Sequence, residues 1–151
     1  MRHQIAYRRH LPHFQRADKT YLVTFATRNR RVLSEASRDL VLAEIVRQHE
    51  QTALLHTAVV MPDHVHMVLT PTIPLASIAR LIKGRTARQI NLSLGRRGTV
   101  WQEEPHDHQL RSADSLAQKC EYVALNPVRA GLARDPEEYR WLWRRWVDLP
   151  G

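Results

Sequence analysis

Several stretches of the chain have the pattern of hydrophobic and polar residues that is typical of β-strands. Residues 21–27 alternate between the two kinds and are rich in aromatic and β-branched side chains, which predicts a first strand. Two apolar runs, 54–61 and 64–70, flank a tight connection at 61–63, so we expect them to be antiparallel neighbours. A short run at 99–102 is predicted to be the fourth strand.

Three other stretches show the spacing of apolar residues that marks amphipathic helices. The first runs from a capping Ser34 to about residue 51, the second covers 75–94, and the third begins near Ser112. The order of strand, helix, two strands, helix and strand predicts an α+β fold, a ferredoxin-like antiparallel sheet with both helices on one side. The third helix, which carries Tyr122, follows this unit.

Length and composition favour one soluble domain. At 151 residues the chain can bury one proper core, and we divide it into a basic arm (1–20), a core (21–134) and a tail rich in tryptophan and arginine (135–151). No apolar run approaches the ~20 residues that span a bilayer, and the start leads into no signal-like segment, which predicts a cytoplasmic protein without a membrane partner. The one cysteine, Cys120, excludes an internal disulfide and a cysteine-rich zinc site, so metal ligands must be nitrogen and oxygen.

The charge of the chain favours a polyanionic partner. There are 23 lysines and arginines against 15 acidic residues, a formal net charge of +8, and nucleic acid is the commonest partner of such a protein. A merely well-solvated basic surface is the alternative. In the tail, Trp141, Trp143 and Trp146 are interpreted either as a stacking platform for bases or as a cover. The candidate DNA contacts in the arm, on the second helix and in the turn after it are Arg8, Arg9, Arg80, Lys83, Arg85, Arg88, Arg96 and Arg97.

The third predicted strand contains two histidines separated by one residue. Side chains alternate along a strand, so His64 and His66 share a face, where two imidazoles can bind one cation with further ligands from elsewhere. A pair of half-exposed histidines without a ligand is the alternative. A second pair, His106 and His108, follows Pro105 in a segment without alternation, which we predict to be a loop. Oxygen ligands for this rival metal site are available from Glu103, Glu104 and Asp107.

The third helix contains a tyrosine and an asparagine that are four residues apart. This spacing places Tyr122 and Asn126 one turn from each other on the same face. A tyrosine in this position is most often a packing residue. Asn126 also has a structural interpretation, because it precedes Pro127 and could cap a short turn that Gly131 closes.

Taken in order, these motifs resemble those of the HUH single-tyrosine transposases. The arm at 8–14 is similar to the branch called REP-associated tyrosine transposases. The resemblance covers most of the chain, to about Tyr139, and departs from the family at Asp63, where many relatives have asparagine, and at 103–105. The motifs that carry it are residues 21–25, 61–66, 100–102, 110–111 and 122–132.

The resemblance implies a specific chemistry on DNA. It predicts metal-dependent cutting and rejoining of single-stranded DNA at hairpins, with His64, His66 and Asn126 as ligands of Mg²⁺ or Mn²⁺ and Tyr122 as the nucleophile. The product is a 5′-phosphotyrosine and a free 3′-hydroxyl. The REP-associated branch is expected to act as a monomer. Two other functions stay open at this point: a domesticated protein that binds hairpins without cutting them, and a metal-dependent phosphoesterase.

Overall fold

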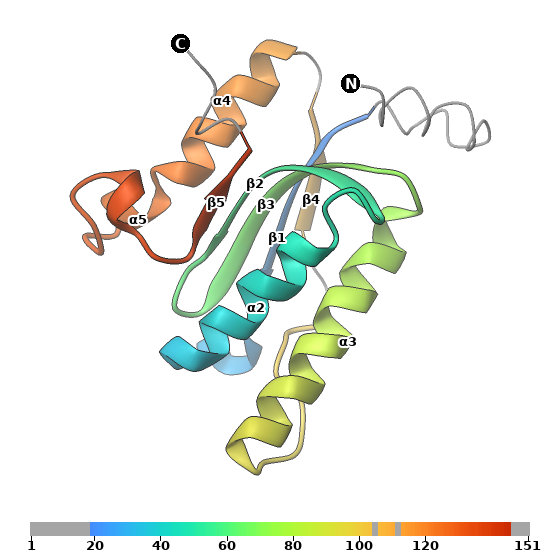
Figure 1. The fold of residues 1–151 in the computed structure, drawn as a ribbon, viewed down its shortest axis with the longest axis vertical. Coiled ribbons are helices and arrows are strands. Elements are labelled where there is room, and N and C mark those ends of the chain that lie inside the picture. Colours follow the sequence, from blue (N-terminus) through green and yellow to red (C-terminus); the bar gives the residue numbers. More distant parts are fainter. Residues whose placement is uncertain (1–18, 104–105, 111–112, 146–151) are drawn as a thin grey trace.

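A five-stranded antiparallel sheet organises the molecule (Figure 1). The computed structural model describes residues 19–103, 106–110 and 113–145. The strands stand side by side in the order β4-β1-β3-β2-β5, and every neighbouring pair is antiparallel. Their bounds are β1 Tyr21–Ala26, β2 Ala53–Val60, β3 His64–Pro71, β4 His106–Gln109 and β5 Leu142–Arg144.

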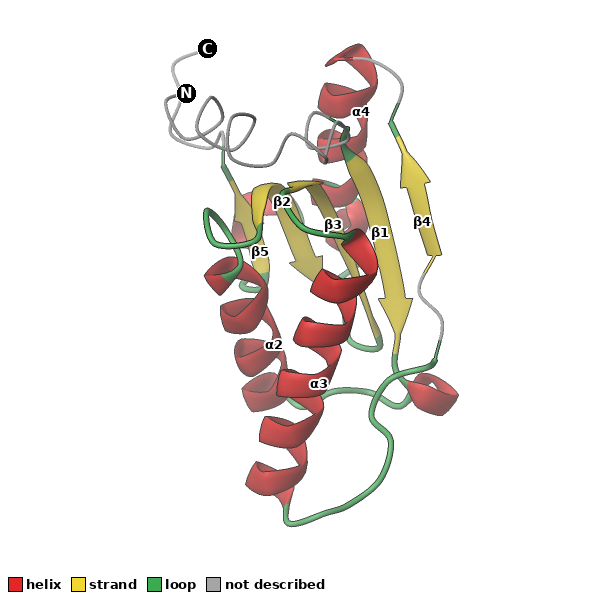
Figure 2. Cartoon of the chain, turned by 90° about the vertical axis from the view of Figure 1, so that its right-hand side faces the viewer, coloured by secondary structure: helices red, strands yellow, loops and turns green. Residues whose placement is uncertain are grey.

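Helices cover both faces of this sheet (Figure 2). Helices α2, Glu35–Arg47, and α3, Leu75–Leu94, lie side by side on one face, and α4, Ala113–Ala124, lies on the other against β2 and β3. The short α5, Asn126–Arg129, follows α4 directly. The predicted α+β fold, with two helices on one side and a separate tyrosine helix, is therefore confirmed.

Strand alternation explains why β3 can serve both faces. Val65, Met67 and Leu69 share one face of the strand and are almost fully buried, whereas His64 and His66 share the other face and are only partly buried. The first helix begins as expected, because the Ser34 hydroxyl accepts a hydrogen bond from the Ser37 amide at 3.1 Å.

The predicted fourth strand at 99–102 is wrong. Only an isolated bridge joins Trp101 to Thr27, because the indole is buried instead, edge-on to Phe25 and donating from Nε1 to the Thr86 hydroxyl of α3 at 2.9 Å. The segment predicted to be a loop supplies β4, which pairs with β1 at the sheet edge. All four residues of β4 are exposed, so its sequence has no alternation of apolar residues that would predict a strand.

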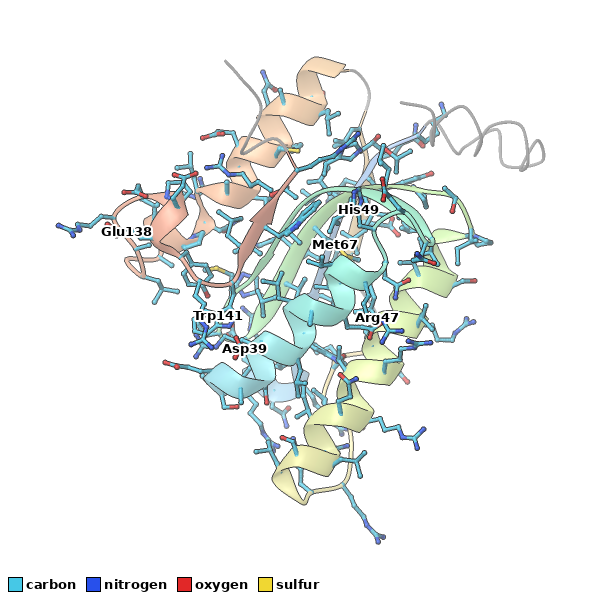
Figure 3. The ribbon with its side chains drawn as sticks, in the orientation of Figure 1. Asp39, Arg47, His49, Met67, Glu138 and Trp141 are labelled. Atoms are coloured by element: carbon cyan, nitrogen blue, oxygen red, sulfur yellow. The ribbon has the colours of Figure 1, made fainter. Side chains whose placement is uncertain are left out.

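The tail completes the other edge of the sheet. Trp141, which Figure 3 places beside Asp39 at the start of α2, is buried between the guanidinium groups of Arg38 and Arg140, and its Nε1 donates to Asp39 at 2.7 Å. Trp141 therefore has no face free for a DNA base, so that part of the stacking interpretation is wrong, and Trp146 lies outside the described residues. In the described part of the chain, no helix has the length and apolar character needed to cross a membrane.

A buried histidine makes the stability of this fold depend on pH. Burial, with the nearby charges of Arg145 and His49, lowers the pKa of His56 from 6.5 to about 4. Between these values the unfolded chain takes up a proton that the folded chain does not, so stability is complete above about pH 6.5 and falls as the pH falls toward 4. A shift of this size corresponds to at most about 3 kcal/mol.

We expect this loss to shrink in His56→Gln, whose side chain can still reach the Thr70 hydroxyl that His56 contacts at 2.9 Å. Urea unfolding curves across the pH range measure the change, and the exposed His106→Gln provides the control. If the unfolding free energy of His56→Gln depends on pH as strongly as that of the wild type, another group causes the acid sensitivity. His66 would then be tested first, because its pKa is similarly lowered.

Candidate functional site

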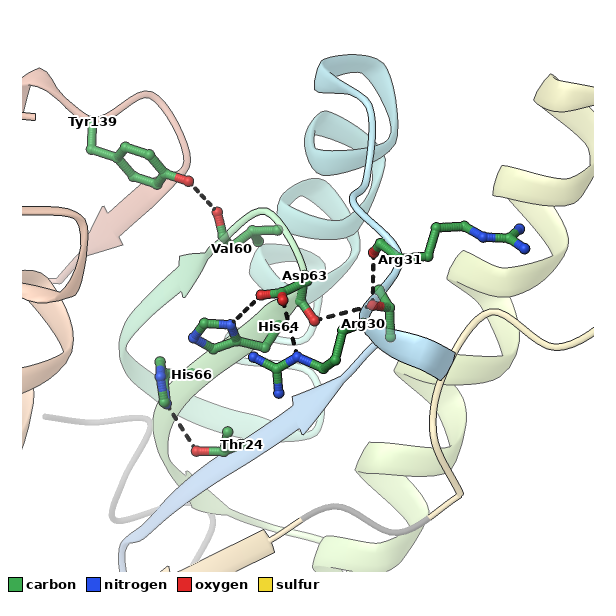
Figure 4. A network of polar contacts seen from close by, with 9 residues as sticks. Thr24, Arg30, Arg31, Val60, Asp63, His64, His66 and Tyr139 are labelled. Atoms are coloured by element: carbon green, nitrogen blue, oxygen red, sulfur yellow. Dashed lines mark hydrogen bonds and ion pairs between the residues drawn. The ribbon is translucent and has the colours of Figure 1, made fainter. Parts of the chain in front are cut away.

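The two histidines of β3 form the centre of the site (Figure 4). A tight turn at 61–63 holds their strand, since the Met61 amide donates to the His64 carbonyl oxygen at 2.8 Å. The imidazole rings are 4.9 Å apart, edge to face, on the side of the sheet that α4 covers in part. Strand alternation thus brings the two rings together as the sequence predicts.

Each imidazole is oriented by a partner at Nδ1. His64 Nδ1 lies 2.7 Å from an Asp63 carboxylate oxygen, and His66 Nδ1 lies 2.9 Å from the Thr24 hydroxyl. With Nδ1 engaged on both rings, Nε2 is the nitrogen of each that remains for a cation. Partners of this kind fix the orientation of metal-binding histidines.

The Asp63 carboxylate is itself held by a strained turn between β1 and α2. Arg30 Nε donates to the second oxygen of Asp63 at 3.0 Å, and Thr27 binds the Asp63 carbonyl oxygen through its amide at 2.9 Å. Asn29 and Arg30 both have left-handed backbone angles, φ 58° and 54°, which cost free energy in residues other than glycine. Burial acts to raise the pKa of Asp63, but hydrogen bonds from His64 and Arg30 outweigh it and lower that pKa, so the carboxylate stays charged.

Burial also sets the protonation state of His66. Its pKa falls from 6.5 to about 4, because burial, and then the neighbouring charges of His64 and Arg129, disfavour the imidazolium form. The ring is therefore neutral at physiological pH, which is the form that binds a metal.

Helix α4 brings Tyr122 over these rings. Its inner face packs on the sheet through Cys120, Val123 and Ala124, and this packing leaves Tyr122 at the side of the helix, 45% exposed. The phenol ring stands edge to face with His66 at 6.4 Å between centroids. The nucleophile candidate and the histidine pair thus share one surface.

Two cations that the sequence analysis did not single out lie against this phenol. The guanidinium of Arg129 lies 4.4 Å from the Tyr122 ring centroid and donates to the Tyr122 carbonyl oxygen at 2.8 Å, and the Lys119 ammonium lies 5.6 Å from the same centroid. Their spacings from Tyr122, seven and three residues, are helical neighbour spacings that could have predicted both contacts. The Thr24 and Arg30 contacts depend on strand pairing and on the turn, which no local spacing indicates.

Asn126 lies one turn beyond Tyr122, as predicted, but as the first residue of α5, because α4 ends at Ala124. Its amide nitrogen donates to the Tyr122 carbonyl oxygen at 3.3 Å, which leaves Oδ1 as its possible donor atom to a cation. The capping interpretation is wrong, because the residue before α5 is Leu125 and no side chain caps that helix. Among the described residues, no three His, Cys, Asp or Glu side chains gather as a metal site.

The rival histidine pair lies on the same side of the sheet but at its edge. Thr24 pairs with both His66 and His106, so these three residues form one row across β3, β1 and β4. Asp107, one residue on, points to the opposite face, and His106 and His108 are exposed. Glu104 lies outside the described residues.

The predicted DNA-contacting cations divide into groups. Arg8 and Arg9 lie outside the described residues. The four on α3 are across the sheet from Tyr122 (Figure 1), and two of these already have partners: Lys83 binds the carbonyl oxygens of residues 102 and 103, and Arg85 lies 3.8 Å from Glu44. Arg96 and Arg97 follow α3 in the turn at its far end.

Known proteins resemble this chain in both sequence and fold. Residues 16–124 match the family model described as IS200-like transposase. Among solved structures, the chain is similar to a REP-associated tyrosine transposase bound to a REP hairpin, with 22% identity, a TM-score of 0.66 and coverage of 82% of this chain and 75% of that one. A candidate transposase from Deinococcus radiodurans R1 has 25% identity and a TM-score of 0.45 over 70% of this chain and 88% of that one. No curated protein sequence matches significantly.

Proposed function

Because this chain belongs to the IS200-like transposase family, we propose that it cuts and rejoins single-stranded DNA through a covalent bond to Tyr122. The observation that carries this proposal is the position of the half-exposed phenol edge to face with His66, beside the second imidazole of the pair. The phenol thus faces an imidazole whose Nδ1 is already oriented by Thr24 and whose other side meets the second imidazole of the pair.

The Tyr122 hydroxyl oxygen attacks the scissile phosphorus. An ester bond forms between this oxygen and phosphorus while the bond from phosphorus to the 3′ oxygen breaks, and the phenol proton leaves as the departing 3′ oxygen becomes a hydroxyl. The product is a 5′-phosphotyrosine, which conserves the phosphodiester bond, so a second 3′-hydroxyl can reverse the step and join strands. No hydrolytic water is required.

The residues present fit a divalent ion of the Mg²⁺ or Mn²⁺ kind. We assign the ligands to His64, His66 and Asn126, because two oriented imidazoles and one amide oxygen are a nitrogen and oxygen set that leaves room for substrate. When bound, the ion offsets the charge that develops on the scissile phosphate. Arg129 and Lys119 contribute positive charge on the side of the phenol.

We propose hairpin-containing DNA of the REP kind as the target. Support comes from the fold neighbour, which was solved with a REP hairpin, and from the basic arm at 8–14. We also propose that the protein acts as a monomer, since Tyr122 lies over the histidines of its own chain.

The experiment that tests the proposal incubates the protein with labelled hairpin DNA from the sequence that flanks its own gene, with Mn²⁺ or with EDTA. Denaturing gels then separate free from protein-linked DNA. A Mn²⁺-dependent protein-linked band supports tyrosine chemistry. Cleavage without the adduct would instead support a metal-dependent phosphoesterase, and binding without either product would support a non-cutting hairpin binder.

Mixing two inactive variants tests whether one chain supplies the whole site. We expect Tyr122→Phe and His64→Ala to stay inactive together, because a monomer cannot combine the intact tyrosine of one chain with the intact histidines of another. The measured quantity is the protein-linked band at increasing total protein concentration. Recovery of activity in the mixture would show that α4 is exchanged between chains.

A further inference from the structure

Helix α3 carries a lysine in a chain whose basic residues are almost all arginines. Of the 23 lysine and arginine residues, only Lys19, Lys83 and Lys119 are lysines, and Lys83 shares α3 with three arginines. Arginine stays charged in proteins, whereas a partly buried lysine can lose its proton and act as a nucleophile. Lys83 is therefore a candidate for covalent chemistry.

Lys83 borders a hollow between α3 and the segment at 99–103. The hollow has a volume of about 500 Å³, a size typical of sites that hold small molecules. Arg80 and Glu103 also border it, but most of its wall is apolar. The apolar part is formed by Ala76, Ala79, Ala87, Val100 and Trp101. A small molecule with both an apolar and an anionic group fits this lining.

Two backbone carbonyl groups hold the Lys83 amine in place. Its Nζ donates to the carbonyl oxygens of Gln102 and Glu103, the second at 3.0 Å. A neutral amine has two N–H groups, so these carbonyls can use both and leave the lone pair for another partner. Burial favours the neutral form by lowering the pKa of Lys83, although the negative charge of Glu103 acts in the opposite direction. The carbonyls thus position an amine that can react with an electrophile.

A guanidinium group lies beside this amine. Arg80 is exposed and precedes Lys83 by three residues, so the two are neighbours on the helix surface, with about 5–6 Å between their Cβ atoms. In the described part of the chain Arg80 forms no ion pair, whereas Arg85 lies 3.8 Å from Glu44. The planar guanidinium suits the oxygens of a phosphate group. Arg80 can therefore bring an electrophile that carries a phosphate to the amine.

We propose that Lys83 is a site of acylation by acyl phosphates, with Arg80 binding the phosphate of the donor and the apolar hollow receiving the acyl group. The amine lone pair attacks the acyl carbon. A bond from nitrogen to this carbon forms, the bond from the carbon to the phosphate oxygen breaks, and the phosphate leaves with the amine proton as hydrogen phosphate. The site lies across the sheet from Tyr122 (Figure 2), and the proposal does not depend on the proposed cleavage of DNA.

Acylation changes what holds the segment at 99–103. The amide product has one N–H group and no charge, so one of the carbonyl oxygens of Gln102 and Glu103 loses its donor. This segment lies between α3 and β4 in the chain. We expect amide hydrogen exchange at 99–103 to increase in the acetylated protein, while exchange in β2 and β3 stays unchanged. Unchanged exchange at 99–103 would contradict the role given to the two carbonyls.

The three lysines allow acylation rates to be compared within one sample. The protein is incubated with acetyl phosphate near neutral pH, and mass spectrometry of its peptides measures acetylation at Lys19, Lys83 and Lys119 over time. We expect Lys83 to react about fivefold faster than the other two, and we expect Arg80→Gln to remove this advantage. Arg88→Gln is the matched control and should react at the wild-type rate. Arg88 is an exposed arginine of the same helix that does not border the hollow, and each variant loses one positive charge.

A donor without phosphate tests the role of Arg80. With the uncharged thioester S-acetyl-N-acetylcysteamine, we expect wild type and Arg80→Gln to react equally at Lys83. If Lys83 reacts with acetyl phosphate no faster than Lys19 and Lys119, the proposal is overturned. Equal slowing by Arg80→Gln and Arg88→Gln also overturns it, because the effect of charge is then not local. The same loss with both donors in Arg80→Gln overturns it too, because Arg80 then acts on the amine and not on the phosphate.

Discussion

Tyr122→Phe should reduce formation of the protein-linked DNA product by more than about 10³-fold while leaving hairpin affinity within about twofold of wild type. The phenyl ring keeps the edge-to-face contact with His66 and the contacts with Arg129 and Lys119, so only the attacking oxygen is lost. Denaturing gels with Mn²⁺ measure the adduct, and anisotropy measures affinity.

Tyr21→Phe is the matched control for this change. Tyr21 begins β1 and is partly buried, and we expect this variant to form the adduct at the wild-type rate. If Tyr122→Phe still forms a covalent product, the nucleophile is another residue and the proposed mechanism fails. If it loses affinity along with the adduct, Tyr122 has a role in holding DNA that the proposal does not include.

His64→Ala and His66→Ala should each weaken Mn²⁺ binding by more than about 100-fold and lower adduct formation to a similar extent. Each change removes one imidazole from a set that has only two, and removal of even a supporting partner typically costs 10–100-fold in metal affinity. Titration calorimetry of the protein without DNA measures the affinity independently of any reaction.

The second histidine pair supplies the control for this prediction. His106→Ala and His108→Ala remove imidazoles that are exposed on the same side of the sheet, and we expect Mn²⁺ affinity to stay within about twofold of wild type. The reverse ranking would move the metal to β4. Equal and small losses in all four variants would mean that neither pair holds the ion.

The sequence was most informative where one periodicity decides the structure. Two-residue alternation correctly placed His64 and His66 on one face, and helical spacing correctly placed Asn126 one turn from Tyr122, although the structure divides these two residues between α5 and α4. The prediction of a strand at 99–102 was wrong because Trp101, an apolar residue, packs against α3 and donates to its Thr86 hydroxyl.

Long-range pairing determined the parts of the structure that the sequence did not indicate. Strand β4 has four exposed residues and exists because β1 offers a free edge. The Arg30 contact to Asp63 depends on left-handed backbone angles at Asn29 and Arg30, and neither residue type indicates that conformation in the sequence. The departure from the family at Asp63 acquires a physical meaning here, because a carboxylate binds both His64 and Arg30.

Because β5 lies at the C-terminal end of the chain, the sheet can be completed only at the end of synthesis. Strand β2 borders β3 on one side and the C-terminal β5 on the other, so its outer edge stays unpaired until residues 142–144 leave the ribosome. By then the histidines and Tyr122 have already been made. A stop codon shortly before residue 141 would therefore yield a chain with the chemical groups present but with an open sheet edge and without the Trp141 contact to Asp39. We expect such shortened copies of the gene to produce protein that aggregates or is degraded.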